Sequence, residues 1–191
     1  MSEKFDKGKV SVVLPVYNGE LNVYQSISSI LKQTYSNLEL IIVNDCSTDH
    51  TIDVLKKYAE QDPRITVINN LVNLKLPRSL NVGFEQATGE YFTWTSDDNL
   101  YKENAIERMV SALQSFPDFD MVYANYTNID ADGQIIGEGR LEEPEHLLTG
   151  NVIGACFLYT KEIAQKVGEY DINLFLAEDY DYWIRILHAG K

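Results

Sequence analysis

Apolar and polar positions along the first half of the chain alternate in a repeated pattern of strand, turn and helix. Short, largely β-branched apolar runs with the length of buried strands occur at 10–14, 38–43, 65–68 and 91–95. Segments with apolar residues at helical spacing follow these runs at 22–33, 51–60, 77–87 and 102–116. Strands that alternate with helices usually pair in parallel and are covered on both faces. The pattern therefore predicts an α/β fold with a mostly parallel central sheet.

The pattern changes after Pro117. The expected elements are then two strands around a turn, one further strand and two helices, at 121–126, 134–137, 156–159, 161–167 and 180–189. The turn at 130–133 joins the first two strands and predicts a hairpin. Because no linker or repeat interrupts the chain, we expect a mixed-sheet extension of one domain that spans residues 1–191.

Loops rich in polar side chains follow three of the four parallel strands, at 15–18, 44–49 and 96–99. The carboxyl ends of parallel strands meet at one edge of a sheet, where ligands bind. The third loop contains Asp97 and Asp98, whose mutual repulsion is relieved by a cation or by hydrogen-bond donors. These residues favour a metal-and-nucleotide site, and the alternative is a turn that caps the helix expected from Lys102 onward.

The chain is acidic, with 29 Asp and Glu against 16 Lys and Arg and a formal net charge of -13. This charge repels polyanions, so nucleic acid and anionic membrane surfaces are not expected partners. No apolar run reaches the roughly 18 residues that span a bilayer, and the N-terminus lacks the apolar core of a signal peptide. We therefore expect a soluble, cytoplasmic protein without a transmembrane segment. Cys46 and Cys156 match no metal or redox spacing.

Glycine-rich phosphate loops are absent from the sequence. Neither G-x-G-x-x-G nor G-x-x-x-x-G-K-[ST] follows any predicted strand, which argues against a dinucleotide dehydrogenase and a P-loop enzyme. A diphosphate could instead be held by a divalent cation on Asp98, because magnesium and manganese bridge carboxylates to phosphate oxygens. A cation would also allow this acidic site to bind an anionic ligand.

Four motifs occur in the order found in family 2 glycosyltransferases, at 10–18, 43–49, 89–98 and 178–179. The resemblance runs from about Val10 to the end of the chain. It implies a Rossmann-like three-layer GT-A fold, with a nucleotide-binding half at about 9–99 and an acceptor-side half at about 100–191. It also implies a metal-dependent, inverting transfer of sugar from a nucleotide diphosphate, foremost a UDP-sugar. The implied acceptor is a hydroxyl of a glycan or lipid-linked molecule in cell-surface polysaccharide synthesis, which is compatible with peripheral membrane association.

The resemblance assigns roles around the donor to residues at the strand ends. Pro15 belongs to the first donor-binding motif, and Tyr17 resembles the aromatic residue that packs on the base. Asp45 resembles the acid that binds the uracil edge. Asp97 resembles the acid that reaches the ribose and the donor sugar, whereas Asp98 resembles the ligand of Mn²⁺ or Mg²⁺.

Further roles follow from the same resemblance. Lys75 and Arg78 occupy the loop in which the family often places a cation against the diphosphate. Glu178 and Asp179 resemble the acidic pair on the acceptor side, in which Asp179 is the general base. Inverting transfer needs a carboxylate on the face opposite the leaving nucleotide, and Asp181 is the nearest rival for that task.

Three positions depart from the family pattern. Ser96 replaces the first acid of the D-x-D motif, which leaves open which carboxylate contacts the metal. Asn44 replaces an additional Asp and keeps its hydrogen-bonding capacity. Cys46 replaces a frequent Gly and fits only where the backbone does not require a positive φ. Family members also usually continue beyond the helix that carries the base, so we expect a truncated or unusually short enzyme.

Two other functions stay open at this point. One is a sugar-1-phosphate nucleotidyltransferase of related architecture, although its usual glycine-rich basic loop is not found at 15–20. The other is a non-catalytic domain that binds sugar nucleotides. The sequence does not indicate the sugar, the acceptor, the linkage or the oligomeric state.

Overall fold

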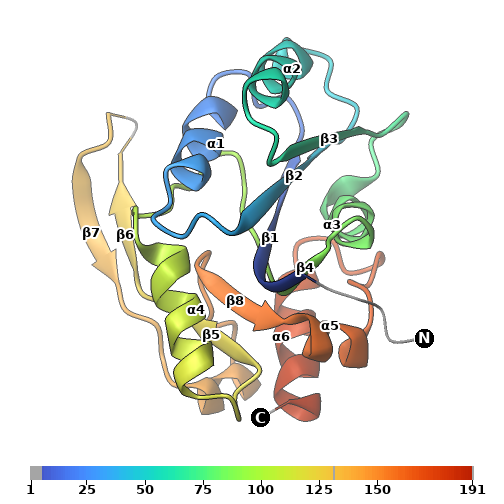
Figure 1. Ribbon diagram of the computed structural model, residues 1–191. Coiled ribbons are helices and arrows are strands. Elements are labelled where there is room, and N and C mark those ends of the chain that lie inside the picture. The colour runs from blue at the N-terminus through green and yellow to red at the C-terminus, as the bar shows by residue number, and fades with distance from the viewer. Residues whose placement is uncertain (1–5, 131, 191) are drawn as a thin grey trace.

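The central feature of the computed structural model, which describes residues 6–130 and 132–190, is a six-stranded sheet (Figure 1). The strand order is β3-β2-β1-β4-β8-β5. The strands are β1 (Asp6–Val16), β2 (Leu38–Asn44), β3 (Ile65–Asn69), β4 (Gly89–Trp94), β8 (Phe157–Thr160) and β5 (Met121–Tyr123). The first four pair in parallel, and β8 is antiparallel to both β4 and β5. The expected α/β fold with a mostly parallel sheet is confirmed.

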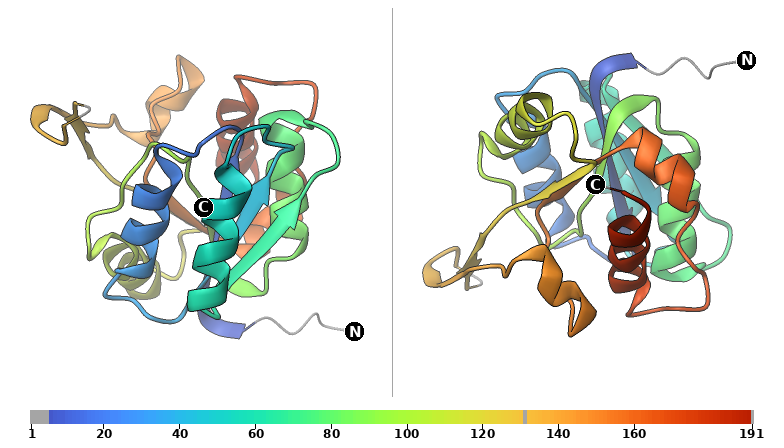
Figure 2. Two further views of the ribbon diagram at one scale, coloured as in Figure 1. Left: turned by 90° about the horizontal axis from the view of Figure 1, so that it is seen from above. Right: turned by 90° about the horizontal axis from the view of Figure 1, so that it is seen from below.

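Helices cover both faces of this sheet and complete three layers (Figures 1 and 2). They are α1 (Val23–Leu31), α2 (Thr51–Gln61), α3 (Lys75–Glu85), α4 (Ala105–Ser115), η1 (Pro144–Leu148), α5 (Lys161–Val167) and α6 (Glu178–Ala189). The apolar sides of α1, α2 and α4 share one core with the sheet, and those of α3, α5 and α6 share the other. None of the described helices is long and apolar enough to cross a membrane.

Strand β1 is buried on both faces, which explains its continuous apolar run. Val10, Val12 and Leu14 pack into the core beneath α1, α2 and α4, whereas Val13 packs into the core beneath α3 and α6. Burial of one such side chain contributes about 1.5–3 kcal/mol to folding. Ser11 is also fully buried, and its hydroxyl donates to Glu39 Oε1 at 2.6 Å and accepts from the backbone of Gly89.

The predicted strand at 121–126 is wrong in its extent, because the chain leaves the central sheet after β5. A second short strand, β6 (Tyr126–Ile129), pairs with β7 (Ile135–Gly139) as the expected hairpin. This hairpin is a separate two-stranded sheet that stands away from the body of the protein (Figure 1). The ring of Tyr126 lies against the backbone of Gly139, where a Cβ would be 2.2 Å from the ring.

Candidate functional site

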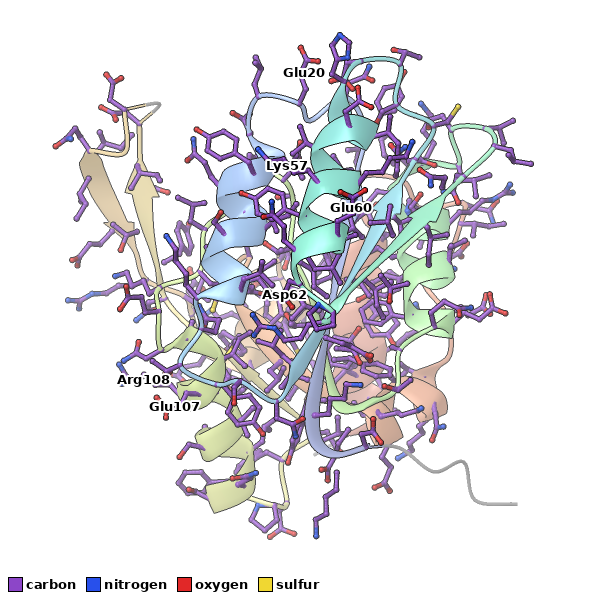
Figure 3. The ribbon with its side chains drawn as sticks, turned by 45° about the horizontal axis from the view of Figure 1, so that its top comes forward. Glu20, Lys57, Glu60, Asp62, Glu107 and Arg108 are labelled. Carbon is purple, nitrogen blue, oxygen red and sulfur yellow. The ribbon has the colours of Figure 1, made fainter. Side chains whose placement is uncertain are left out.

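The loops after β1 and β2 are joined to each other at the carboxyl edge of the sheet. The side chain of Asn18 accepts from the backbone N–H of Thr48 at 2.8 Å. The backbone N–H of Asn18 donates to Ser47 Oγ at 3.0 Å. The N–H of Gly19 donates to Thr51 Oγ1 at 2.8 Å. Glu20 lies at this edge, far from Asp62 beyond the other end of α2 (Figure 3). The two loops therefore form one surface that is held in place by its own hydrogen bonds.

Pro15 lies inside β1 at the point where β1 and β4 separate. Backbone groups of a strand point alternately to its two neighbours. Val13 O accepts from the N–H of Thr95 on the β4 side, and Val16 O accepts from the N–H of Asp45 on the β2 side. The backbone nitrogen of Pro15 therefore faces the β4 side, where the hydrogen bonds between β1 and β4 have already ended. The missing N–H of proline thus costs the sheet no hydrogen bond. Beyond it, Tyr17 is 51% exposed at the edge of the sheet.

Asp45 follows β2 and caps the start of α3. Its Oδ1 accepts from Asn70 Nδ2 at 2.9 Å and from the N–H of Leu74 at 2.8 Å, and its Oδ2 accepts from the N–H of Lys75 at 2.9 Å. Negative charge at a helix N-terminus is favourable because the first N–H groups lack partners within the helix. This contact explains why α3 begins at Lys75 and not at the predicted Pro77.

Lys75 and Arg78 therefore lie in the first turn of α3 and not in a loop, as the sequence had suggested. Both side chains are exposed. Arg78 lines a groove of about 910 Å³ between α3 and α5, together with Lys161 and Tyr170. The described residues that line this groove include none from the polar loops after β1, β2 and β4. Of the two cations, Lys75 is thus the one next to Asp45.

Cys46 adopts a φ of 63°, so the backbone here does take the left-handed conformation that favours glycine. The condition under which Cys46 fits without strain is therefore not met. Its thiol contacts the backbone oxygen of Leu71 at 3.6 Å. This contact favours a structural role for Cys46 in the β2 loop.

Asp97 and Asp98 follow β4 and point in different directions. The carboxylate of Asp97 is half-buried against Gly19, where a Cβ would lie 2.4 Å from Asp97 Oδ2. Burial raises the pKa of Asp97, and the charges of Asp98 and Asp49 raise it further. Asp98 is exposed, and its Oδ1 accepts from Ser96 Oγ at 2.6 Å. The inward carboxylate faces the β1 loop, and the outward one faces solvent.

This loop does not cap the next helix. Helix α4 begins at Ala105, and its N-cap is Asn104. The loop is instead held by α1, because the fully buried Ser26 hydroxyl lies 2.9 Å from the backbone oxygens of both Ser96 and Asn99. The capping alternative is therefore wrong, although Asn99 N–H does close a weak turn onto Ser96 O at 3.4 Å.

Asp179 lies in the first turn of α6, which begins two residues before the predicted start. Its Oδ1 accepts from the N–H of Tyr180 at 2.7 Å, and its Oδ2 accepts from Asn151 Nδ2 at 2.9 Å. The rival Asp181 forms an ion pair with Arg185 at 2.8 Å. The two acids therefore differ in their partners: Asp181 is paired with a guanidinium, whereas Asp179 contacts an amide and a backbone N–H.

Glu178 differs from its neighbour because it is buried, with 4% of its surface exposed. Its Oε2 is buried and has no hydrogen-bond partner among the described residues. Burial raises the pKa of Glu178, and the charge of Asp179 adds to the shift. The buried start of α6 therefore disfavours the charged form of Glu178, and its acceptor-side role stays a prediction.

We expect Glu178→Gln to stabilise the protein at neutral pH by about 1 kcal/mol, because burial of a charged carboxylate costs more than burial of a neutral amide. The raised pKa means that the folded state binds this proton more tightly than the unfolded state. Wild-type stability is thus lost as pH rises from the ordinary carboxyl range through the folded pKa. The gain of the variant should grow over the same interval, as urea unfolding at several pH values will measure. Glu60→Gln, at an exposed position on α2, is the control, and an equal pH dependence of wild type and Glu178→Gln would contradict the prediction.

An aromatic network connects the end of β4 to α6. Trp94 Nε1 donates to the hydroxyl of Tyr170 at 3.0 Å, and the ring of Tyr170 stacks on Tyr182 with 4.0 Å between centroids. Burial raises the pKa of Tyr170 far above its usual value, and the charge of Asp179 contributes. The end of β4, just before the loop that carries Asp97, and the helix that carries Asp179 are therefore linked through Tyr170.

Residues 11–168 match the family model described as Glycosyl transferase family 2. The chain belongs to glycosyltransferase family 2. An uncharacterised glycosyltransferase of Haemophilus influenzae is 43% identical over 95% of this chain. The chain spans 61% of the length of that relative.

Solved structures show that this family 2 glycosyltransferase has the GT-A fold. Staphylococcus aureus TarS 1-349 in complex with UDP-GlcNAc matches 93% of this chain and 52% of its own, with a TM-score of 0.74 and 20% identity. The mannosyltransferase PcManGT of Pyrobaculum calidifontis, in complex with GDP-Man and Mn²⁺, matches 95% of this chain and 53% of its own. Its TM-score is 0.74 at 18% identity. The expected three-layer GT-A fold is confirmed.

At the β4 end of this glycosyltransferase, Asp98 is the residue that could hold a divalent cation. The described residues contain no group of three or more His, Cys, Asp and Glu side chains that could hold a metal by themselves. The exposed Asp98 accepts one hydrogen bond, which leaves most of its lone pairs for a metal. Such a metal would take one or two ligands from the protein and the rest from water and phosphate, as magnesium commonly does.

Sequence reasoning assigned no individual role to four residues around the candidate site: Asn70, Trp94, Asn151 and Tyr170. Asn70 contacts Asp45, Asn151 contacts Asp179 across 28 positions, and Trp94 contacts Tyr170, which stacks on α6. No local motif marks an amide or an aromatic ring that acts through such a contact. These residues can be recognised only from the three-dimensional arrangement of the strands and helices.

Proposed function

We propose that this family 2 glycosyltransferase moves a sugar from a UDP-sugar to a hydroxyl of a glycan or lipid-linked acceptor with inversion of the anomeric centre. The observation that carries the proposal is the placement of two kinds of carboxylate. Asp97 and Asp98 follow β4 at the carboxyl edge of the sheet, and Asp179 is held at the start of a helix linked to the end of β4. Cell-surface polysaccharide synthesis is the setting that we propose.

The donor would lie across the loops after β1, β2 and β4. Tyr17, two residues beyond Pro15, offers an exposed ring for the base. Asp45 Oδ2 accepts one hydrogen bond within the protein, which leaves capacity for an N–H of uracil. Asp97, turned toward the β1 loop, would bind the ribose and the sugar.

The diphosphate would be held between α3 and the β4 loop. Lys75, in the first turn of α3, would face the phosphates, and Arg78 would contribute only if its side chain leaves the groove that it lines. Mn²⁺ or Mg²⁺ at Asp98 would supply positive charge that stabilises the leaving diphosphate. Lys75 would add to that charge from the protein side.

The chemistry assigned to Asp179 is proton removal. The acceptor hydroxyl attacks the anomeric carbon, the bond from that carbon to the diphosphate oxygen breaks, and UDP leaves with the electron pair. Asp179 takes the proton of the hydroxyl. Glu178, beside it, would shape the acceptor side of the site.

Donor class and turnover can be tested with a panel of UDP-GlcNAc, UDP-glucose, UDP-galactose and GDP-mannose. We expect thermal shifts with UDP-sugars and release of UDP, because a ligand that binds only the folded state raises its stability. Pyrophosphate release from UTP and a sugar 1-phosphate would support a nucleotidyltransferase instead. Thermal shifts without any release of nucleoside diphosphate would support a non-catalytic binding domain.

Removal of divalent metal is expected to weaken UDP binding by at least about tenfold, because Asp97 and Asp98 would then repel the diphosphate. Calorimetric titration of UDP in Mn²⁺ and in EDTA measures this difference. Asp98→Asn should remove most of the difference, whereas Asp118→Asn, at an exposed position after α4, should not. Equal UDP affinity with and without Mn²⁺ would rule out the metal site.

A further inference from the structure

Among the described residues, the amide of Asn151 provides a side-chain hydrogen bond to the carboxylate of Asp179. Asn151 Nδ2 lies 2.9 Å from Asp179 Oδ2, and Asn151 Oδ1 accepts from the N–H of Ile153 at 3.3 Å. A backbone N–H can only donate, so the carbonyl oxygen of the amide must face Ile153. The NH₂ group is therefore the part of Asn151 that faces Asp179.

The segment around Asn151 is anchored on both sides. Before it, the hydroxyl of Tyr180 donates to the backbone oxygen of Leu147 at 2.6 Å, and Leu147 is 3% exposed. After it, Ile153 is buried in the same core as α6. The N–H of Gly150 also donates to His146 O at 3.2 Å. Asn151 is thus carried by a segment fixed to the first turn of α6.

We infer that Asn151 is a positioning residue that orients the Asp179 carboxylate for proton removal, an inference that rests on the proposed function. A general base works only in a narrow geometry, and a third group commonly holds it there. Here Oδ1 is held by the N–H of Tyr180 and Oδ2 by Asn151, so the plane of the carboxylate is set from two directions. An amide does this without taking a proton and without adding charge.

Because of its location, this hydrogen bond can be removed to test the orientation of Asp179 without unfolding the protein. The hydrogen bond lies at an exposed part of the surface, where its loss costs little stability. Neither Asn151 nor its segment belongs to the loops after β1, β2 and β4 that would bind the nucleotide. Loss of the contact should therefore lower the rate of transfer and leave UDP binding and folding nearly unchanged.

Two variants test this inference. Asn151→Ala removes the amide, whereas Asn151→Asp keeps the acceptor for Ile153 N–H but replaces the donor to Asp179 with a negative charge. We expect both variants to release UDP with a kcat about tenfold to a hundredfold below wild type, measured with the UDP-sugar of the panel that the wild type uses. Their affinity for UDP should stay within about twofold of wild type. Asn37→Ala, which removes an exposed amide at the opposite edge of the sheet, should keep wild-type kcat.

The combined variants distinguish the possible failures. Asn151→Ala in the Asp179→Asn background should cause no further loss, because the two residues act as a unit. Wild-type kcat in Asn151→Asp, or an equal loss of UDP affinity in both Asn151 variants, would overturn the inference alone. Wild-type kcat in Asp179→Asn would instead overturn the assignment of the base.

Discussion

Asp179→Asn is expected to lower kcat by about 10²–10⁴-fold and to leave UDP affinity unchanged. An amide has nearly the same shape as a carboxylate but cannot accept the proton of the attacking hydroxyl. The new side chain can still accept from the N–H of Tyr180, so the first turn of α6 should persist. Steady-state release of UDP gives kcat, and calorimetry with UDP and Mn²⁺ gives the affinity.

Asp181→Asn is the matched control for this prediction. The substitution makes the same chemical change two residues away and removes the ion pair with Arg185. Partly exposed ion pairs contribute at most about 1 kcal/mol, so the variant should fold. We expect kcat close to wild type. A large loss in Asp181→Asn together with high activity in Asp179→Asn would exchange the roles of the two acids.

Gly19→Ala is expected to weaken UDP binding by about tenfold or more. This effect does not require residue 19 to contact the nucleotide, because it acts through Asp97. A Cβ at this position would lie 2.4 Å from Asp97 Oδ2 and 2.6 Å from Val16 Cγ2. Both distances are far below van der Waals contact, so the Asp97 carboxylate must move out of the place that it occupies. The donor would then lose the acid proposed to bind its ribose.

Stability measurements separate this effect from general damage. Overpacking costs typically about 1–3 kcal/mol, so Gly19→Ala should still fold. Gly137→Ala on β7 is the control, because its Cβ would meet its nearest neighbour, Asn128, at an ordinary 3.7 Å. In an Asp97→Ala background, Gly19→Ala should have little further effect on UDP affinity. A full additional loss there would show that Asp97 does not mediate the effect.

Local patterns predicted the elements and the edge at which the site forms. The strands from β1 to β4 follow from their apolar runs, and the placement of Asp45, Asp97 and Asp98 follows from parallel pairing, which brings strand ends to one edge. Contacts between distant residues could not be predicted in this way. The start of α3 depends on a cap from Asp45, which lies 30 positions before Lys75.

Backbone conformation was also beyond the sequence pattern. Cys46 and Lys75 both adopt positive φ values, which residue type alone argues against. The break between β5 and β6 likewise left no signal, because 121–126 has a continuous strand-like composition. Propensity describes one residue and its neighbours, whereas these conformations are imposed by the surroundings.

The central position of β1 has a consequence for how the chain is made. Its neighbours are β2, which follows closely, and β4, which begins at Gly89. A ribosome that adds about 5–20 residues per second needs about 4–15 s to extend the chain from the end of β1 to the start of β4. During that interval one edge of the central strand β1 is open to other nascent chains. The yield of folded protein should therefore depend on how quickly translation passes through the segment between these two strands.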